Sequence, residues 1–236
     1  MKKDILIASS SSTRINLSEY AASSLAITVQ AGVHYRCIYD KSNFQNFDIV
    51  FHLQRDAILD CVLLITEGEL LNINLAISLE GEYAQANVRG LYALSGSQQL
   101  AITTSQHHKA PHATSNLIIK GMLNDHAKAD YRGNILVDQV AKYTNAVQEN
   151  KNILLSRTAH AQSIPCLEVL TNDVQCKHGS AVGYLDEQSL FYVQSRALDA
   201  QTARQLLLHG FFIEIIDALD ASMISDIYEI IKKKSM

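Results

Sequence analysis

The chain has 236 residues, of which 47% are apolar and 19% are charged, as is usual for a globular protein and not for a disordered one. Its formal net charge of −4 gives no basic surface field, which argues against nucleic acid as a partner. No apolar stretch reaches the roughly 20 residues that a membrane-spanning helix needs. Four scattered cysteines are too few for a disulfide framework, so we expect reduced thiols in a cytoplasmic protein.

Apolar and polar residues alternate through most of the chain before Leu185. The clearest run extends from Leu25 to Tyr39, and a second extends from Leu71 to Leu79. A period of two is what a strand with one buried face requires, because successive side chains point to opposite sides. These runs therefore predict strands, and shorter apolar runs predict further strands at 49–53, 62–66, 100–103, 117–119, 135–137, 153–155 and 167–170.

Similar tetrapeptides begin at Asn116, Asn134 and Asn152, at equal intervals along the chain, and a fourth begins at Cys166 after a slightly shorter interval. A short period with two strands per turn is typical of a β-solenoid, whose coils stack on one another. We expect the asparagines to lie in line and to hydrogen-bond from coil to coil. A β-sandwich is the alternative, but the chain has few glycines and prolines and no Asn-Gly or Asp-Gly hairpin signal. The solenoid is the favoured prediction.

After Gly183 the apolar period changes to 3.6, which predicts helices. Asp186, Asp199 and Asp220 are the candidate N-caps of three of them. The second helix, around 206–216, has more apolar residues than a single buried face needs. We therefore predict a mainly β protein with a solenoid over residues 1–183 and a C-terminal helical region over residues 184–236.

Cys176 and His178 are the residues with the most suggestive chemistry. Two residues apart on a strand, they would face the same side and offer a thiolate and an imidazole, which are soft metal ligands. A closed metal site needs four ligands, and no CxxC or HxxxH pattern in the chain completes one. Either the pair is a structural thiol and a surface histidine, or its missing ligands come from another chain or from a distant part of this one.

Three histidines lie close together at His107, His108 and His112, on either side of Pro111. Such a cluster suggests a metal site, but a polar corner whose imidazoles bond to the backbone is the simpler interpretation. Their metal role stays open at this stage.

A different function is suggested by Asp125, Asp130 and Asp138, since β-helix enzymes that act on polysaccharides place paired carboxylates on one strand face. Aspartate is also common in turns and loops, which explains the same residues more simply. No nucleophile elbow, P-loop or dinucleotide-binding glycine pattern is present in the chain.

Eight ordered segments give the second half a specific resemblance. They are APHATS at 110–115, KGML at 120–123, YRGNI at 131–135, QENKNILLS at 148–156, DVQCKHGS at 173–180, VGYLDEQSLFY at 182–192, SRA at 195–197 and ARQLLLHGF at 203–211. With these segments the chain resembles the SufB/SufD family of iron–sulfur cluster assembly scaffold proteins, and its Cys-x-His-Gly form resembles the SufD branch.

This resemblance implies a right-handed parallel β-helix followed by helices, and a scaffold that is not an enzyme. It implies a SufB-like partner bound edge to edge through the β-helix, a SufC-like ABC ATPase docked on the C-terminal helices, and a transient Fe–S cluster at the subunit interface that this chain alone does not hold. Typical SufD chains carry a further N-terminal helical region and more β-helix, so the resemblance is to a short member of the family.

Carried over position by position, the resemblance assigns His178 to cluster assembly at the interface and Cys176 to the same motif, with any metal shared with the partner chain. The candidate ATPase-docking residues are Arg204, Leu207, Leu208, Phe211 and Phe212. Two alternatives stay open: a stand-alone homodimeric β-helix binding module, and a β-helix enzyme that acts on polysaccharide.

Overall fold

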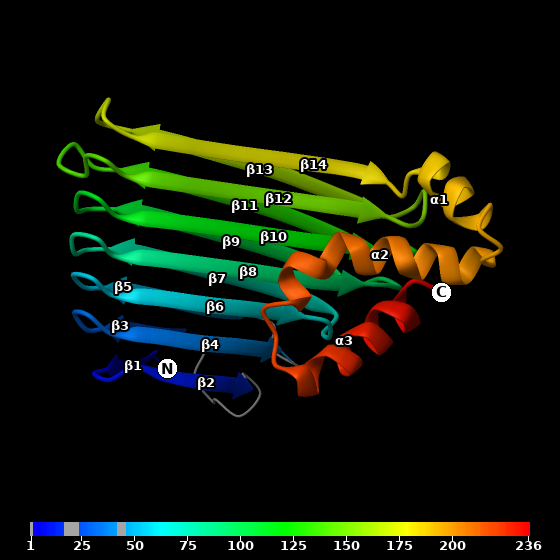
Figure 1. Cartoon of the computed structure of the whole chain (residues 1–236), viewed down its shortest axis with the longest axis horizontal. Coiled ribbons are helices and arrows are strands. Elements are labelled where there is room, and N and C mark those ends of the chain that lie inside the picture. Colours follow the sequence, from blue (N-terminus) through cyan, green and yellow to red (C-terminus); the bar gives the residue numbers. More distant parts are fainter. Residues whose placement is uncertain (1, 17–23, 42–45) are drawn as a thin grey trace.

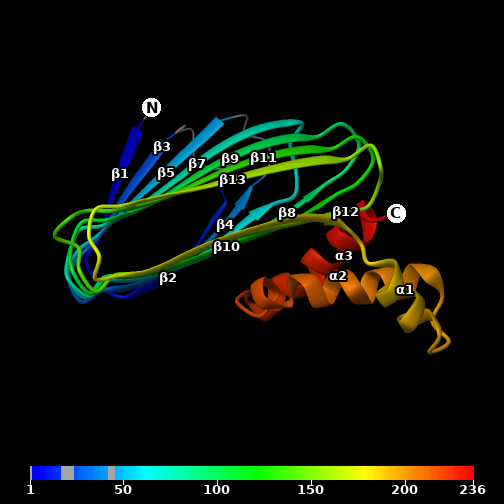
Figure 2. The same cartoon turned by 90° about the horizontal axis from the view of Figure 1, so that it is seen from above.

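The computed structural model is a flattened β-solenoid with three helices on one side, and it describes residues 2–16, 24–41 and 46–236 (Figures 1 and 2). Residues 17–23 and 42–45, which belong to the predicted solenoid range 1–183, lie outside the described residues. Within the described ranges, sheet A and sheet B each have seven strands, and all the strand pairs are parallel. The predicted fold class is confirmed, and the β-sandwich alternative is excluded.

The strands alternate between the two sheets along the chain. Sheet A contains β1 (Lys2–Ile7), β3 (Ser24–Val29), β5 (Asn46–Leu53), β7 (Leu70–Leu79), β9 (Gln99–His108), β11 (Lys128–Val137) and β13 (His160–Val169). Sheet B contains β2 (Ser11–Asn16), β4 (His34–Lys41), β6 (Ile58–Ile65), β8 (Gln85–Leu94), β10 (Thr114–Leu123), β12 (Asn145–Leu154) and β14 (Gln175–Tyr184).

The interior between the sheets is filled by the alternating apolar residues, as the period of two predicts. In β7, for example, Leu71, Ile73 and Leu75 are buried while Leu70, Asn72 and Asn74 are exposed. The run from Leu25 to Tyr39 is two strands rather than one, however, because Gly32 turns the chain with a φ of +69°. Val29 and Val33, on either side of this turn, are both buried and have the same parity, so the sequence pattern shows no break.

The predicted short period is wrong, because the successive tetrapeptides that define it lie on strands of opposite sheets. Gln85, Thr114, Asn145 and Gln175 begin successive strands of sheet B in register, so one coil is much longer than the interval between the tetrapeptides. Asn116 is in β10 and Asn134 is in β11, and therefore the asparagines do not form one stacked row. The equal interval between the tetrapeptides is the step from one sheet to the next.

The helices follow their predicted caps. Helices α1 (Glu187–Gln194) and α2 (Ala200–Ile216) begin after Asp186 and Asp199, whose carboxylates accept hydrogen bonds from the first-turn N–H groups. Helix α3 (Ala221–Lys234) begins after Asp220, whose side chain makes no cap bond.

Helices α2 and α3 lie against the outer face of sheet B, whereas α1 extends past the end of the sheet (Figure 2). The outer face of sheet B is apolar where they pack. Residues of β4, β6, β8 and β10 form one buried cluster with both helices: Ile38, Val62, Leu64, Leu91, Ala93, Met122, Leu208, Phe212, Ile215, Ile216, Met223, Ile227 and Ile231. Lys120 adds polar contacts, since its Nζ donates to the carbonyl oxygen of Phe211 and to Glu214, each at 2.9 Å.

Candidate functional site

The solenoid ends at β13 and β14, the two edge strands at the top of Figure 1. Among the described strands, β14 pairs only with β12 and β13 pairs only with β11, so each presents a free row of backbone donors and acceptors. Nothing in the sequence of β14 distinguishes it as a last strand. Its position at the end becomes clear only from the fold.

Cys176 and His178 lie on β14 and share one face, as their spacing predicts. They are in register with Ala146 and Gln148 of β12, both of which are buried inside the solenoid. Cys176 and His178 therefore face the interior of the last coil. His178 is exposed only because no further coil covers it.

Cys176 is half-buried and packs beside a small apolar cluster that contains Ile135, Val137 and Ala146. Burial raises the pKa of the Cys176 thiol, and a hydrogen bond with the backbone of Ala146 offsets only part of that rise. The side chain is thus a protonated thiol at neutral pH until a metal or a nearby cation displaces its proton.

The open coil also presents apolar side chains that face inward. Val182 is 42% exposed and Tyr184 is 60% exposed, although the residues directly beneath them in β12, Asn152 and Leu154, are buried. Leu167 of β13 is likewise exposed above buried Ile135. Such residues would be core if another coil followed, so the end of the solenoid is a surface suited to a second chain.

Cys166 lies on β13 at the same end and is exposed, but it is in register with Asn134 on the outer face of sheet A. Cys37 and Cys61 are buried far from this end. Among residues 2–16, 24–41 and 46–236, no group of three histidine, cysteine or acidic side chains is arranged to hold a metal ion. Cys176 and His178 therefore supply two ligands at most, and any others must come from elsewhere.

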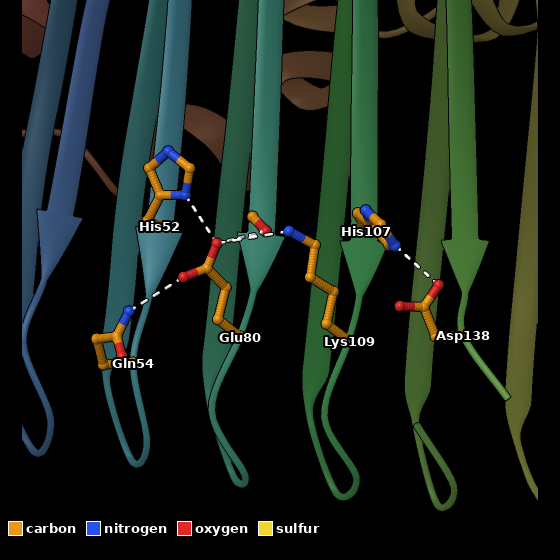
Figure 3. A network of polar contacts seen from close by, with 7 residues as sticks. His52, Gln54, Glu80, His107, Lys109 and Asp138 are labelled. Carbon is orange, nitrogen blue, oxygen red and sulfur yellow. Dashed lines mark hydrogen bonds and ion pairs between the residues drawn. The ribbon is translucent and has the colours of Figure 1, made fainter. Parts of the chain in front are cut away.

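The three clustered histidines separate completely in the structure. His107 forms a hydrogen bond with Asp138, at 2.9 Å between Nε2 and Oδ1, on the outer face of sheet A (Figure 3). His108 faces the interior and bonds to the hydroxyl of Ser115 at 2.8 Å, and burial lowers its pKa to about 4. His112 lies in the next turn, stacked between the rings of Tyr83 and Tyr143. They do not form one metal site.

Figure 3 shows a polar network that crosses neighbouring coils of sheet A. Glu80 bonds to His52 at 2.8 Å and lies 3.5 Å from the ammonium group of Lys109. Burial alone would raise the pKa of Glu80. The hydrogen bonds from His52 and Ser78, together with the electrostatic effect of His52 and Lys109, lower it below its usual value. With its carboxylate engaged by these groups, Glu80 serves to join coils rather than to bind a ligand.

The three aspartates of the polysaccharide hypothesis also lie in different places and have different partners. Asp125 lies in a turn with a φ of +55° and accepts a hydrogen bond from the N–H of Gly96. Asp130 faces outward on β11, and Asp138 follows that strand and binds His107. They are not gathered as a catalytic pair.

The structure divides the predicted ATPase-docking residues into two groups. Leu208 and Phe212 are fully buried against sheet B, so their apolar surface is used inside the protein. Arg204, Leu207 and Phe211 are partly exposed. The sequence pattern could not separate the two groups, since α2 is apolar on more than one face. Leu206 and Ile213, which lie within the 206–216 helix expected to dock the ATPase, are exposed, as are Phe191 and Tyr192 of α1, although none of the four is among the docking residues named from the sequence.

A family model described as the SUF system FeS cluster assembly, SufBD core domain, matches residues 8–211. The chain belongs to this SufBD family. An iron–sulfur cluster assembly SufBD family protein of Mycobacterium leprae is 31% identical over 71% of this chain and 45% of its own length. The iron–sulfur cluster assembly protein SufD of Escherichia coli is 30% identical over 64% of this chain and 36% of its own.

A chloroplast protein of Arabidopsis thaliana, ABCI7, is 37% identical over 42% of this chain and 21% of its own length. The chain thus spans less than half the length of these curated relatives. Its family membership and fold agree with the resemblance drawn from the sequence. None of the helices in the described ranges has the length and apolar character needed to cross a bilayer.

Proposed function

We propose that this SufBD-family chain is a SufD-like scaffold subunit, without catalytic activity of its own, that helps to assemble iron–sulfur clusters in the cytoplasm. The observation that carries the proposal is the open last coil, where Cys176 and His178 face an interior that no further described strand covers. The proposal is supported by the chemistry of a thiol and an imidazole, which are side chains of the kind that ligate iron, and by their position at an exposed end of the solenoid.

The proposed partner at this surface is a SufB-like chain with the same fold. A parallel edge strand satisfies its backbone groups best by pairing with another strand, and Val182 and Leu167 offer apolar contact area beside it. The cluster would form between the two chains and then leave, as cargo rather than as a resident cofactor. Cys176 and His178 provide part of its ligand set, and the partner provides the remainder.

A SufC-like ATPase is the second proposed partner, docked on the exposed side of the C-terminal helices. Helices α2 and α3 are anchored to sheet B, while Leu206, Ile213 and Phe191 remain exposed. A helix that is fixed to the sheet that contains β14 is well placed to pass a nucleotide-dependent movement to the open coil. The exposed apolar positions, rather than Leu208 and Phe212, make this docking surface.

The deciding experiment is anaerobic co-expression of the tagged chain with the SufB-like and SufC-like proteins of its own organism, followed by purification and iron and sulfide assays. The native chain should recover both partners and a cluster. His178→Ala should recover both partners but lose most of the cluster. Lys177→Ala is the matched control, because Lys177 is exposed on the opposite face of the same strand and should behave like the native chain.

Two results would refute the proposal. One is full cluster content in the complex that carries His178→Ala. The other is recovery of the chain alone, metal-free, as a homodimer through its open end, which would establish the stand-alone binding module instead.

A further inference from the structure

The last coil offers a partner two strand edges, β13 in sheet A and β14 in sheet B, and the direction of each backbone N–H in them is known. Successive N–H groups of a parallel strand point alternately toward its two neighbours. The N–H of Gln175 donates to Thr144, just before β12, at 2.9 Å. The N–H of His160 donates to Ala127, just before β11, at 3.0 Å. The inward-facing residues of both strands, which have the other parity, therefore direct their N–H groups to the side on which no described strand lies.

The free edge of β14 is complete. Its inward-facing residues are Cys176, His178, Ser180, Val182 and Tyr184, and each of them has a backbone N–H. A partner strand can therefore form hydrogen bonds along the whole length of β14.

The free edge of β13 is interrupted near its centre. Its inward-facing residues are Ala161, Ser163, Pro165, Leu167 and Val169. Proline has no N–H to donate, and its ring obstructs the approach of a partner strand. Within sheets, proline is confined to edge strands, strand starts and bulges. Pro165 therefore fits in the middle of β13 as long as the strand keeps a free edge at this point.

Pro165 lies across the open coil from His178. One coil below, a Cβ on Gly133 would lie 1.7 Å from Nε2 of Gln148, so these two residues face each other across the interior. Gly133 is in register with Pro165, and Gln148 is in register with His178. The interruption in the edge of sheet A is thus at the same level of the coil as the candidate ligand.

We propose that a partner strand extends sheet B continuously along β14 but does not extend sheet A at Pro165, so that β13 keeps a free edge opposite His178. A strand that paired with β13 there would bury a carbonyl group without a donor, which is destabilising. At β14 no such loss arises, because every inward-facing residue supplies a donor. The inference rests on the proposed function for the identity of the partner, a SufB-like chain. The joint between the two chains is therefore hydrogen-bonded throughout on one side and broken on the other.

Amide hydrogen exchange in the full chain, read residue by residue by NMR with and without the SufB-like partner, tests this inference. On binding, exchange of the His178 and Ser180 N–H groups should slow at least about tenfold, because they become hydrogen-bonded. The N–H groups of Ser163 and Leu167, on either side of Pro165 along the free edge, should exchange nearly as in the free chain. Equal slowing at all four residues would overturn the inference and leave the proposed function intact.

Two matched substitutions provide a second measurement. Ser180→Pro on β14 and Ser163→Pro on β13 each remove one N–H that points to the free edge, and both leave the ladders to β12 and β11 intact. Ser180→Pro should weaken partner binding at least about tenfold, whereas Ser163→Pro should keep it within about twofold of native. Urea unfolding shows whether both variants fold. Equal weakening by two folded variants would overturn the inference, and if either does not fold, exchange in the native chain decides.

Failure of the proposed function would give a different result. The exchange pattern can be read in any end-to-end complex, so a homodimer in place of the SufB-like complex would refute the proposed partner. Slowed exchange along β14 but not beside Pro165 in that homodimer would still support the inference. If neither complex forms, no strand extends β14 and the inference is wrong.

Discussion

Gly133 shows how one missing side chain shapes the solenoid interior. A Cβ at this position would lie 1.7 Å from the amide nitrogen of Gln148 and 2.6 Å from the hydroxyl of Tyr131. Both neighbours are buried, so neither side chain has free space to move into. The residue is selected for the space it leaves, and no positive φ is involved.

Gly133→Ala should therefore destabilise the protein by about 1–3 kcal/mol, the usual cost of overpacking a core. Gly183→Ala on β14 is the control, because a Cβ there would have no neighbour within 4 Å. Urea unfolding of both variants measures the difference. Equal stability of the two would contradict the packing around Gln148 described above.

His108 makes stability depend on pH. Burial lowers the pKa of His108 from 6.5 to about 4, with a smaller contribution from the charge of His107. The unfolded chain binds a proton below pH 6.5, whereas the folded chain resists it until about pH 4. Stability conferred by neutral His108 is therefore complete above pH 6.5 and is lost as the pH falls through this window.

The native protein should lose about 2 kcal/mol of unfolding free energy to His108 between pH 6.5 and pH 4.5. His108→Gln keeps a polar group that can hydrogen-bond to Ser115 but removes the titration, so its stability should change less over the same range. Unfolding free energies measured in urea at several pH values compare the two. The same slope in both proteins would assign the acid sensitivity to other groups.

At the level of strands and helices, the sequence pattern predicts a great deal. Alternation identifies the inward residues correctly, and Asp186 and Asp199 mark helix starts that the structure confirms. Strand β8 is not predicted, because small residues and Gly90 interrupt its apolar pattern. The tetrapeptide interval does not give the coil length, because neighbouring tetrapeptides belong to different sheets, a fact that only pairing reveals.

The candidate site was predictable only in part. A period of two places Cys176 and His178 on the same face, but the sequence cannot tell that this face is the interior of an open coil.

Helix α2 has a face that is buried against sheet B and a face that is exposed. Phe212 is fully buried against sheet B, while Leu206 is 52% exposed on the same helix. Phe212→Ala should cost about 3–5 kcal/mol because it leaves a cavity in the core. Leu206→Ser should change stability by less than about 0.5 kcal/mol, as is usual for surface positions.

Titration with the SufC-like ATPase tests the exposed face of α2. Leu206→Ser combined with Ile213→Ser should weaken SufC-like binding at least about tenfold, since the fully buried core of an interface is apolar and two hydroxyl groups would have to be buried there. Calorimetric titration of the folded double variant measures this. Native affinity in that variant would remove the exposed face of α2 as the docking surface.

At the scale of the whole molecule, strands β13 and β14 form an end of the solenoid. Stacking satisfies the inner coils, whereas the coil of β13 and β14 carries an exposed apolar interior and strand edges that no other described strand pairs. Pairing and cluster assembly are thus expected at the same place, since Cys176 and His178 lie within that coil.

A charge placed inside the open coil should therefore disrupt pairing without affecting the free chain. Val182→Lys puts an ammonium group at an inward position that is 42% exposed now but would be buried beneath a SufB-like partner. Ala181→Lys places the same charge on the outer face of the same strand, at an exposed position.

Both variants should unfold at the native denaturant midpoint. Val182→Lys should bind the partner at least about tenfold more weakly, whereas Ala181→Lys should bind normally, because only the inward lysine must lose its water on assembly. If the two lysines weaken binding equally, the partner contacts the outer face of sheet B, and the open coil is not the pairing surface.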